Sequence, residues 1–171
     1  MITIRPETAE DYAAIHEVTL LAFGQEKEAQ LVEDLRGLPD FIPELSLVAL
    51  QDGQVVGHIL FSPMAIETEK GAVPALSLAP ISVRPECQNQ SVGSQLVREG
   101  LKRCRSLGHE VVVVVGHPAY YPRFGFSSAR AKGLEATFEV PDEAFLVLEL
   151  APGALDGIAG VIKYPPPFNI E

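Results

Sequence analysis

The sequence predicts an α/β (α+β) fold, on three observations. Strand-like runs and segments of helical period follow one another along the chain, and Val111–Val115 is an uninterrupted run of valines, typical of a strand covered on both faces. The 171 residues suffice for one core but are few for two ordinary domains. We therefore predict a single domain over residues 1–171, with a core of about 2–150 and a C-terminal extension of 151–171.

The first predicted elements are a short strand and two helices. Residues 2–6 alternate between apolar and polar side chains and stop at a proline, which predicts a strand. Thr8 is typical of a helix N-cap, and the apolar residues after it recur at helical spacing until Gly24. A second, shorter helix is predicted from about Glu28 to Gly37, where a glycine and a nearby proline end it.

A hairpin and a further strand are predicted next. Residues 45–50 and 55–61 are rich in strand-forming side chains, and the short segment between them contains an Asp-Gly pair, which favours a tight turn. The apolar pattern of the second strand continues toward Glu67. Residues 76–83 predict the next strand, which ends before a proline.

A loop of small polar residues and a helix come after this strand. Gly93, Val97, Leu101 and Cys104 recur at helical spacing and trace one face of a helix that ends near Gly108. The first N–H groups of a helix have no partner within it and carry a partial positive charge, so small residues there let an anion approach the main chain. This arrangement favours a phosphate group as the ligand.

The last third of the chain adds the remaining strands. Val111–Val115 is predicted to lie in the middle of the sheet, and residues 118–126, which are rich in aromatic side chains, predict a short helix or turn. Residues 144–150 predict another strand. The tail over 161–167 ends in a proline run that cannot continue a ladder of hydrogen bonds.

Composition narrows the classes of function. The formal net charge of −10 argues against a general nucleic-acid binder, which needs clustered positive charge, and suits a cationic substrate. No apolar run is long enough to span a bilayer, so we predict no membrane partner and a cytoplasmic location. Cys87 and Cys104 are predicted to be unpaired and lack the spacing of metal ligands, so no metal is expected.

Two motifs resemble those of one enzyme superfamily. Gln88-x-x-Ser91-x-Gly93 resembles the acyl-CoA pyrophosphate loop of the GCN5-related N-acetyltransferase (GNAT) superfamily, Gln/Arg-x-x-Gly-x-Gly/Ala, with serine in place of the middle glycine. The segment from Tyr120 to Phe126, Tyr-Tyr-Pro-Arg-Phe-Gly-Phe, resembles the Phe-Tyr-x-x-x-Gly-Phe element after the fifth strand and is similar to that of a bacterial subgroup of predicted N-acetyltransferases. The alternative for the loop, an ordinary helix start capped by Ser91 or Ser94, does not account for the second motif.

The resemblance implies a GNAT fold, a mixed and mostly antiparallel twisted sheet splayed between strands 4 and 5 and flanked by helices. It also implies that acetyl-CoA is the cosubstrate, with its pyrophosphate on backbone N–H groups of the loop and its pantetheine arm along the fourth strand. The residues assigned to acetyl-CoA in this way are Ile81, Ser82, Val83, Gln88, Asn89, Gln90, Ser91, Val92, Gly93 and Ser94. If Ser91 needs a positive φ, its side chain strains the loop and narrows the approach of the phosphate, so we expect binding to be retained or somewhat weakened.

The resemblance also suggests how the acetyl group moves. A backbone N–H of the fourth strand would stabilise the oxyanion, and Tyr121 matches the family tyrosine that protonates the departing CoA sulfur. The alternative for Tyr121 is an aromatic core residue, the commonest use of tyrosine. The candidates for the base that takes the amine proton are His117, which follows the fifth strand, and Glu67, while Ser82 would orient a water. His58 either lines the substrate groove or is a hydrogen-bonded histidine of the sheet, and the second is favoured.

The predicted function is therefore acetyl transfer from acetyl-CoA to a primary amine by direct attack in a ternary complex, with a small molecule or a peptide as acceptor. The alternative is a non-catalytic acyl-CoA-binding or sensor domain, which Ser91 and the lack of an obvious base favour. A nucleotide-binding domain is disfavoured because the loop has neither Gly-x-Gly-x-x-Gly nor a Walker lysine. Exposed strand edges and the proline-rich tail are compatible with a homodimer.

Overall fold

The computed structural model describes residues 1–170, which form three α-helices, nine strands and several short 3-10 helices. The helices are α1 (Tyr12–Phe23), α2 (Glu26–Arg36) and α3 (Val92–Ser106). The strands are β1 (Ile2–Pro6), β2 (Ser46–Gln51), β3 (Gln54–Thr68), β4 (Gly71–Val83), β5 (Val111–Val115), β6 (Ser127–Ser128), β7 (Leu134–Glu135), β8 (Phe145–Glu149) and β9 (Gly160–Lys163).

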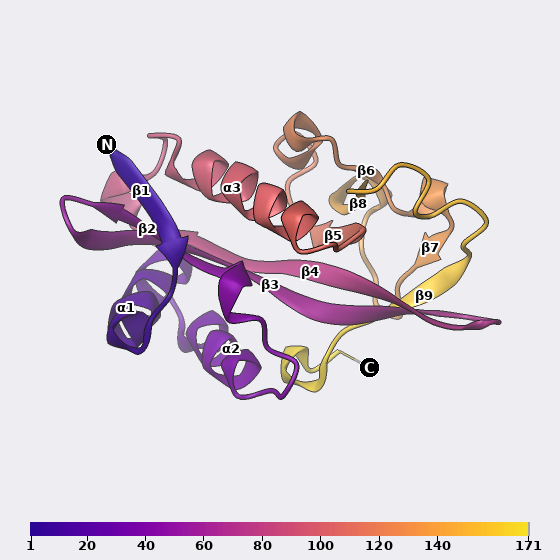
Figure 1. Cartoon of the computed structure of the whole chain (residues 1–171), viewed down its shortest axis with the longest axis horizontal. Coiled ribbons are helices and arrows are strands. Elements are labelled where there is room, and N and C mark those ends of the chain that lie inside the picture. Colours follow the sequence, from indigo (N-terminus) through magenta and orange to yellow (C-terminus); the bar gives the residue numbers. More distant parts are fainter. Residues whose placement is uncertain (171) are drawn as a thin grey trace. The chain divides into compact units, whose positions relative to one another are not determined.

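Most of the sheet is antiparallel. Its strand order is β1-β2-β3-β4-β5-β8-β6, and β9 pairs with β3 and β7 (Figure 1). Over the described residues, parallel pairs are formed by β4 with β5 and by β7 with β9. The register of β4 and β5 covers Leu76↔Val112 and Ser77↔Val113, and β4 continues to Val83. The predicted α/β fold with a mixed, mostly antiparallel sheet is confirmed.

The chain forms two compact units, which are described separately. The first unit contains residues 1–62 and 79–103, and the second contains residues 63–78 and the chain from Cys104 onward. Strands β3 and β4 contribute to both units. The single domain over residues 1–171 stays a prediction from the length of the chain.

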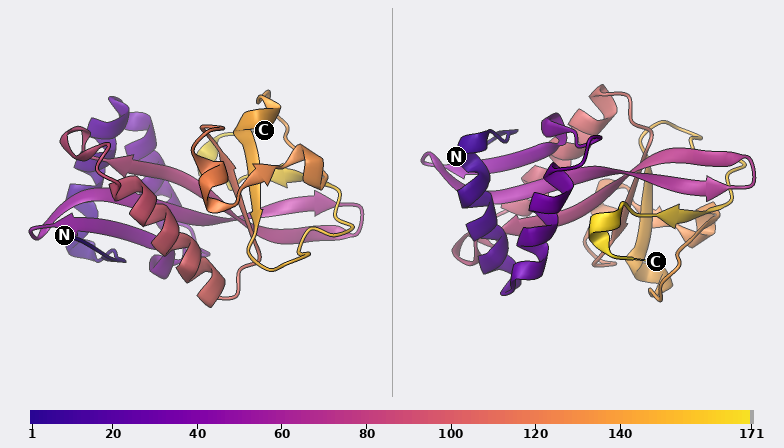
Figure 2. Two further views of the ribbon diagram at one scale, coloured as in Figure 1. Left: turned by 90° about the horizontal axis from the view of Figure 1, so that it is seen from above. Right: turned by 90° about the horizontal axis from the view of Figure 1, so that it is seen from below.

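In the first unit, α1 and α2 cover one face of the strands and α3 covers the other (Figure 1 and Figure 2). The β2–β3 hairpin turns at Asp52 and Gly53, whose φ angles of 52° and 77° are those that the predicted Asp-Gly turn requires. Helix α3 packs tightly on β3, since a Cβ atom at Gly100 would lie only 2.4 Å from Cε1 of Phe61. A glycine in the helix thus makes room for a buried aromatic ring.

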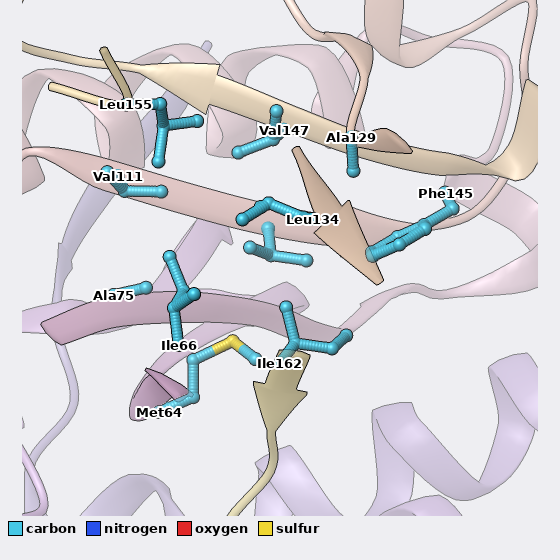
Figure 3. Close-up of a cluster of buried hydrophobic side chains, with 11 residues drawn as sticks. Met64, Ile66, Ala75, Val111, Ala129, Leu134, Phe145, Val147, Leu155 and Ile162 are labelled. Atoms are coloured by element: carbon cyan, nitrogen blue, oxygen red, sulfur yellow. The ribbon is translucent and has the colours of Figure 1, made fainter. Parts of the chain in front are cut away.

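The second unit is built around β5. Its residues Val111–Val114 are buried, and the strand pairs with β4 on one side and with β8 on the other. The prediction of a central strand covered on both faces is confirmed. Figure 3 shows the surrounding core cluster, which comprises Met64, Ile66, Ala75, Val111, Val113, Ala129, Leu134, Phe145, Val147, Leu155 and Ile162.

Some element boundaries differ from the sequence predictions. Strand β4 begins at Gly71 instead of residue 76, because β3 and β4 form a long hairpin in which the Thr68 hydroxyl donates a hydrogen bond to the Gly71 carbonyl (2.7 Å). The two-residue strands β6 and β7 were not predicted, since runs this short carry no recognisable period. None of the helices among residues 1–170 combines the length and the apolar character needed to cross a membrane.

Candidate functional site

The loop between β4 and α3 is held by its own glutamines. It begins with a 3-10 turn at Pro85–Cys87, after which the Gln88 side chain donates a hydrogen bond to the Val83 carbonyl (3.1 Å). The Gln90 side chain donates to the Glu86 carbonyl (3.4 Å). These bonds fold the loop back on its own start, so the backbone of the following residues is presented at the beginning of the helix.

Two residues of this loop have left-handed backbone conformations. Asn89 has φ 63° and Ser91 has φ 66°. Asparagine tolerates this region better than other residues with a side chain, whereas serine is strained there. Ser91 thus has the positive φ at which strain was predicted, and glycine at this position would relieve the strain.

The start of α3 has backbone amides that point toward its N-terminal end, beside this loop. The amide of Gln95 donates to the Ser91 carbonyl (3.0 Å), which closes the first turn of the helix. The amides of Val92 and Gly93 precede this bond and have no partner inside the helix. Together with the partial positive charge of the helix end, they suit an anionic group such as a pyrophosphate. The Ser91 hydroxyl oxygen accepts a hydrogen bond from the Gln95 side chain (3.1 Å), so its proton is available for another acceptor.

A glycine of β3 sets the position of the helix start. A Cβ atom at Gly57 would lie 3.0 Å from Cδ1 of Leu96 and 3.1 Å from Cγ1 of Val92. Val92 is buried. The predicted role of Val92 as an acetyl-CoA residue therefore concerns its backbone, because its side chain packs on the sheet.

The end of β4 completes this group of residues in the first unit. Ile81 and Val83 are half-buried, and Ser82 is buried with its hydroxyl 3.4 Å from that of Thr19 on α1. The Arg84 amide donates to the Val56 carbonyl (2.8 Å), which ties the end of β4 to β3. The structure thus brings the ten residues predicted to bind acetyl-CoA into one continuous stretch of strand, loop and helix start.

Tyr121 lies in the second unit, in a 3-10 turn (Tyr121–Phe124) after β5. Its ring packs on the backbone of Gly116, where a Cβ atom would lie 2.5 Å from Cε2, and meets Phe126 edge-on at 5.7 Å between ring centroids. Burial, with a smaller contribution from Tyr120, raises the pKa of Tyr121 to about 12. The phenol thus stays protonated at neutral pH, which suits a proton donor as well as a core residue.

His117 belongs to the same turn as Tyr121. Its carbonyl accepts hydrogen bonds from the amides of Tyr120 (3.2 Å) and Tyr121 (3.4 Å), while the residue itself is exposed. The backbone of His117 therefore helps to place Tyr121. Its role as a base stays a prediction.

Glu67 lies elsewhere in the second unit. It is exposed on β3 and forms an ion pair with Lys163 of β9 (3.2 Å), at the edge of a cavity of about 240 Å³. Glu67 lies beside the β3–β4 hairpin, where β4 begins. His117 and Tyr121 come after the C-terminal end of β5. This end points away from the hairpin, because β5 runs parallel to β4 and β4 begins at the hairpin. The structure therefore does not bring Glu67 together with these two residues.

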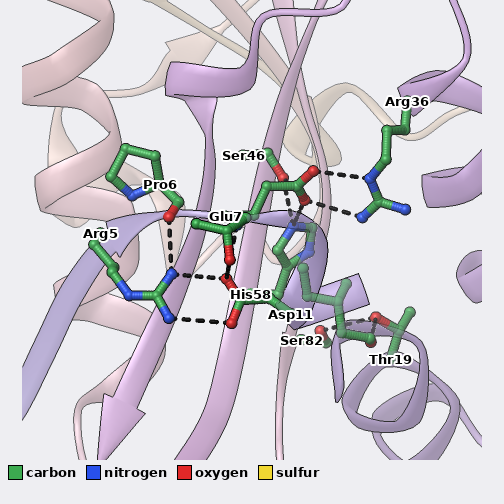
Figure 4. A network of polar contacts seen from close by, with 11 residues as sticks. Arg5, Pro6, Glu7, Asp11, Thr19, Arg36, Ser46, His58 and Ser82 are labelled. Carbon is green, nitrogen blue, oxygen red and sulfur yellow. Dashed lines mark hydrogen bonds and ion pairs between the residues drawn. The ribbon is translucent and has the colours of Figure 1, made fainter. Parts of the chain in front are cut away.

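A buried polar network in the first unit was not predicted from the sequence (Figure 4). Glu7 accepts two hydrogen bonds from Arg36 of α2 (2.8 and 2.9 Å) and one from the Ser46 hydroxyl (2.5 Å). His58 of β3 is fully buried, with Nε2 at 2.8 Å from the Ser46 hydroxyl. The hydrogen-bonded histidine expected in the sheet is therefore observed, but nothing in the sequence indicated its partners.

The charge on Glu7 follows from these contacts. Burial alone would raise the pKa of Glu7, but the His58 ring 3.7 Å away and the hydrogen bonds from Arg36 and Ser46 outweigh it and lower this pKa to about 2. Burial lowers the pKa of His58, against the opposing effect of Glu7. At neutral pH the network thus holds an ionised Glu7 paired with Arg36, and a neutral imidazole.

Sequence comparison places the chain in a known family. A family profile described as an acetyltransferase (GNAT) domain matches residues 3–129. The chain belongs to the GNAT acetyltransferase family, and its fold is the predicted GNAT fold.

Relatives cover nearly the whole chain. The uncharacterized N-acetyltransferase YhbS of Escherichia coli K12 is 37% identical over 167 residues, which are 97% of this chain and 98% of YhbS. The uncharacterized N-acetyltransferase YjhQ of the same organism is 42% identical over 134 residues, 78% of this chain and 74% of YjhQ.

Two similar solved structures contain CoA or acetyl-CoA. The crystal structure of E. coli YhbS in complex with CoA has a TM-score of 0.90 at 35% identity, over 98% of this chain and 92% of that one. A GNAT family acetyltransferase from Brucella melitensis in complex with acetyl-CoA has a TM-score of 0.80 at 34% identity, over 98% of each chain. For the residues that the structure of the present chain describes, no group of three or more His, Cys, Asp or Glu side chains is placed to hold a metal ion.

Proposed function

We propose that the protein is an N-acetyltransferase that moves the acetyl group of acetyl-CoA to a primary amine by direct attack in a ternary complex. The observation that carries this proposal is the loop before α3, where residues with left-handed backbone lead into the N-terminus of a helix on the motif that resembles the family's pyrophosphate loop, an arrangement that suits an anion. The CoA and acetyl-CoA complexes of two relatives support the same ligand.

The proposed binding mode uses main-chain groups. The amides at residues 92–94 and the loop over 88–91 hold the pyrophosphate, and the backbone of Ile81, Ser82 and Val83 pairs with the pantetheine arm. The buried Ser82 side chain points toward α1, which supports a backbone role for this residue in binding. The Ser91 hydroxyl donates to a phosphate oxygen and offsets part of the strain of its conformation.

The proposed chemistry uses Tyr121 as the proton donor to the leaving group. The amine nitrogen forms a bond to the thioester carbon, the oxyanion is stabilised by a backbone N–H of β4, and the C–S bond breaks with its electron pair on sulfur. The Tyr121 phenol gives its proton to the departing thiolate and regains one from the acetylated nitrogen. Because burial raises the pKa of Tyr121 to about 12, the donor is in its protonated form over the whole physiological pH range.

Two measurements test the function. Calorimetric titration with acetyl-CoA, CoA, ATP and NAD should give saturable binding of the first two alone; no binding of acetyl-CoA would refute the proposal. Release of free CoA thiol is then followed with a panel of primary amines, both small molecules and peptides. The net charge of −10 leads us to expect cationic acceptors to react best.

The Tyr121→Phe variant separates an enzyme from a non-catalytic acyl-CoA-binding domain. In an enzyme, binding of acetyl-CoA is kept while turnover falls by about a hundredfold or more, because the proton donor is lost. Unchanged turnover at all pH values would remove Tyr121 from the mechanism. No thiol release from the unaltered protein with any amine, despite tight acetyl-CoA binding, would favour the sensor. The cytoplasmic location and the homodimer stay predictions from the sequence.

A further inference from the structure

Strand β1 leaves one edge of the sheet in the first unit open. It stands at the end of the strand order and, among the described residues, pairs only with β2 (Figure 1). In an antiparallel pair, every second residue directs its N–H and C=O groups to the neighbouring strand, and the residues between direct them away. The outer edge of β1 therefore presents backbone groups that no other strand uses.

The register of β1 identifies these groups. The Glu7 amide donates a hydrogen bond to the Ser46 carbonyl (2.8 Å), so every second residue counted back from Glu7 bonds to β2. Ile2 and Ile4 are the residues between, and their N–H and C=O groups point away from β2. Donors and acceptors of both isoleucines thus lie along the open edge.

Only one end of this edge is protected against pairing with another strand. Natural sheets block open edges with proline, lysine, bulges or a covering segment. Pro6 has no N–H group, and its carbonyl accepts a hydrogen bond from the Arg5 side chain (3.0 Å), so the edge is closed there. Ile2 and Ile4 have no such protection, and both are half-buried. The unprotected part of the edge is therefore apolar and able to pair.

A shallow groove of about 370 Å³ lies beside this edge. It is lined by Ile2 and Ile4 of β1 and by Gln95, Arg98, Glu99 and Lys102 of α3. The helix residues are spaced at i, i+3, i+4 and i+7, so they belong to one side of α3. One wall of the groove is thus apolar, and the other carries charges of both signs.

We propose that the open edge of β1 is a dimer interface, at which the β1 strands of two copies of the chain pair antiparallel across a two-fold axis. In the pairing that uses every free group, Ile2 of each copy lies opposite Ile4 of the other, and these residues exchange both of their hydrogen bonds. The two sheets then continue across the interface as one. This inference goes beyond the proposed function and does not depend on it.

The pattern of the edge favours a second copy as the occupant. Its donors and acceptors repeat on alternate residues, so a rotation by 180° places each donor against an acceptor. Opposite residues of paired strands point to the same face, so the isoleucines of both copies pack side by side next to the grooves. The edge is therefore complementary to itself.

The charges beside the groove favour the same occupant. With a net charge of −10, two copies repel each other unless opposite charges meet at their interface. The α3 wall of the groove has both signs, since Glu99 lies between Arg98 and Lys102 in the helix. The two-fold axis runs the two copies of α3 antiparallel, which directs Arg98 of one copy toward Glu99 of the other.

Sedimentation equilibrium tests the proposal, on the chain with any purification tag at its C-terminus so that β1 stays free. The unaltered protein should form a reversible dimer; a monomer at every concentration would refute the proposal. Ile4→Pro removes an N–H group of the open edge and none of those bonded to β2, so the fold should survive. Because the symmetric pair loses two hydrogen bonds, the Kd of the dimer should rise at least about tenfold, and an unchanged Kd would rule out strand pairing.

Thr3→Ala is the matched control. It changes an exposed side chain of the same strand and keeps every backbone group, so its Kd should equal that of the unaltered protein. Arg98→Glu sets like charges against each other across the axis and should raise the Kd, and adding Glu99→Arg should restore it. A double variant that dimerises as weakly as Arg98→Glu would contradict the two-fold arrangement.

Hydrogen exchange followed by NMR gives a readout that needs no variant. The Ile4 amide should exchange slowly where the dimer is populated and quickly after dilution to the monomer, since only pairing with the second copy protects it. The Arg5 amide is bonded to β2 and should exchange slowly at both concentrations. Fast exchange of the Ile4 amide in a solution that sedimentation shows to be dimeric would overturn the proposal, because the dimer would then use another surface.

Discussion

Replacing Ser91 with glycine tests the backbone strain in the loop before α3. Ser91 has φ 66°, and a left-handed conformation costs a residue with a side chain about 1–2 kcal/mol. Glycine avoids this strain but loses about 0.5–1 kcal/mol through the greater freedom of the unfolded chain. Ser91→Gly should therefore raise the free energy of unfolding by about 0.5–1 kcal/mol, which corresponds to about 1–4 °C in Tm for a chain of this size.

Urea unfolding followed by circular dichroism measures this difference, and two variants serve as controls. Asn89 has a similar φ of 63°, but asparagine tolerates it better, so Asn89→Gly should gain less. Ser91→Ala removes the hydroxyl and keeps the strain, so it should gain nothing. Equal stability of Ser91→Gly and Ser91→Ala would refute the strain argument.

Two further substitutions test the packing and the charges of the first unit. Gly100→Ala gains about 1 kcal/mol of helix propensity, but its Cβ atom would lie 2.4 Å from Cε1 of Phe61, and overpacking costs about 1–3 kcal/mol, so the free energy of unfolding in urea should fall. This fall should be smaller in a Phe61→Leu background, and a rise in the free energy of unfolding would contradict the packing. Glu7→Gln breaks the buried pair with Arg36 and should lower the free energy of unfolding at pH 7 by about 3 kcal/mol. Because the pKa of Glu7 is lowered from 4.5 to about 2 in the folded protein, its contribution is present above pH 4.5 and is lost as the pH falls toward 2, so the two proteins should converge in acid. A constant difference between pH 7 and pH 2 would show that the charge is not its source.

Much of the fold could be predicted because its signals are local. The Asp-Gly pair at Asp52 and Gly53 determines the turn of the β2–β3 hairpin through its positive φ angles, and the five valines of β5 need cover on both faces wherever the strand lies. The two-residue strands β6 and β7 could not be predicted in this way. Their few hydrogen bonds depend on the neighbouring strands β8 and β9, which are distant in sequence.

In the candidate site, too, the residues that are close together in sequence could be predicted, whereas the position of a distant residue could not. The residues predicted to bind acetyl-CoA are nearly consecutive, from Ile81 to Ser94, so a motif could suggest them as candidates. The place of Glu67 could not be read from the motif, because it depends on the direction of the β3–β4 hairpin relative to β5. Sequence alone therefore could not show that Glu67 lies away from the turn that holds Tyr121.

By itself, the sequence determined the order of the helices and the longer strands, the Asp-Gly turn of the β2–β3 hairpin and the loop that precedes α3, since each depends on residues close together in the chain. Only the tertiary structure decided that Glu7, Arg36, Ser46 and His58 form one buried network. These residues come from four separate segments, and their charge and protonation states follow from shared burial and from hydrogen bonds across 12 to 39 positions of sequence. No local pattern encodes such contacts, because they arise only when the strands pair and the helices cover them.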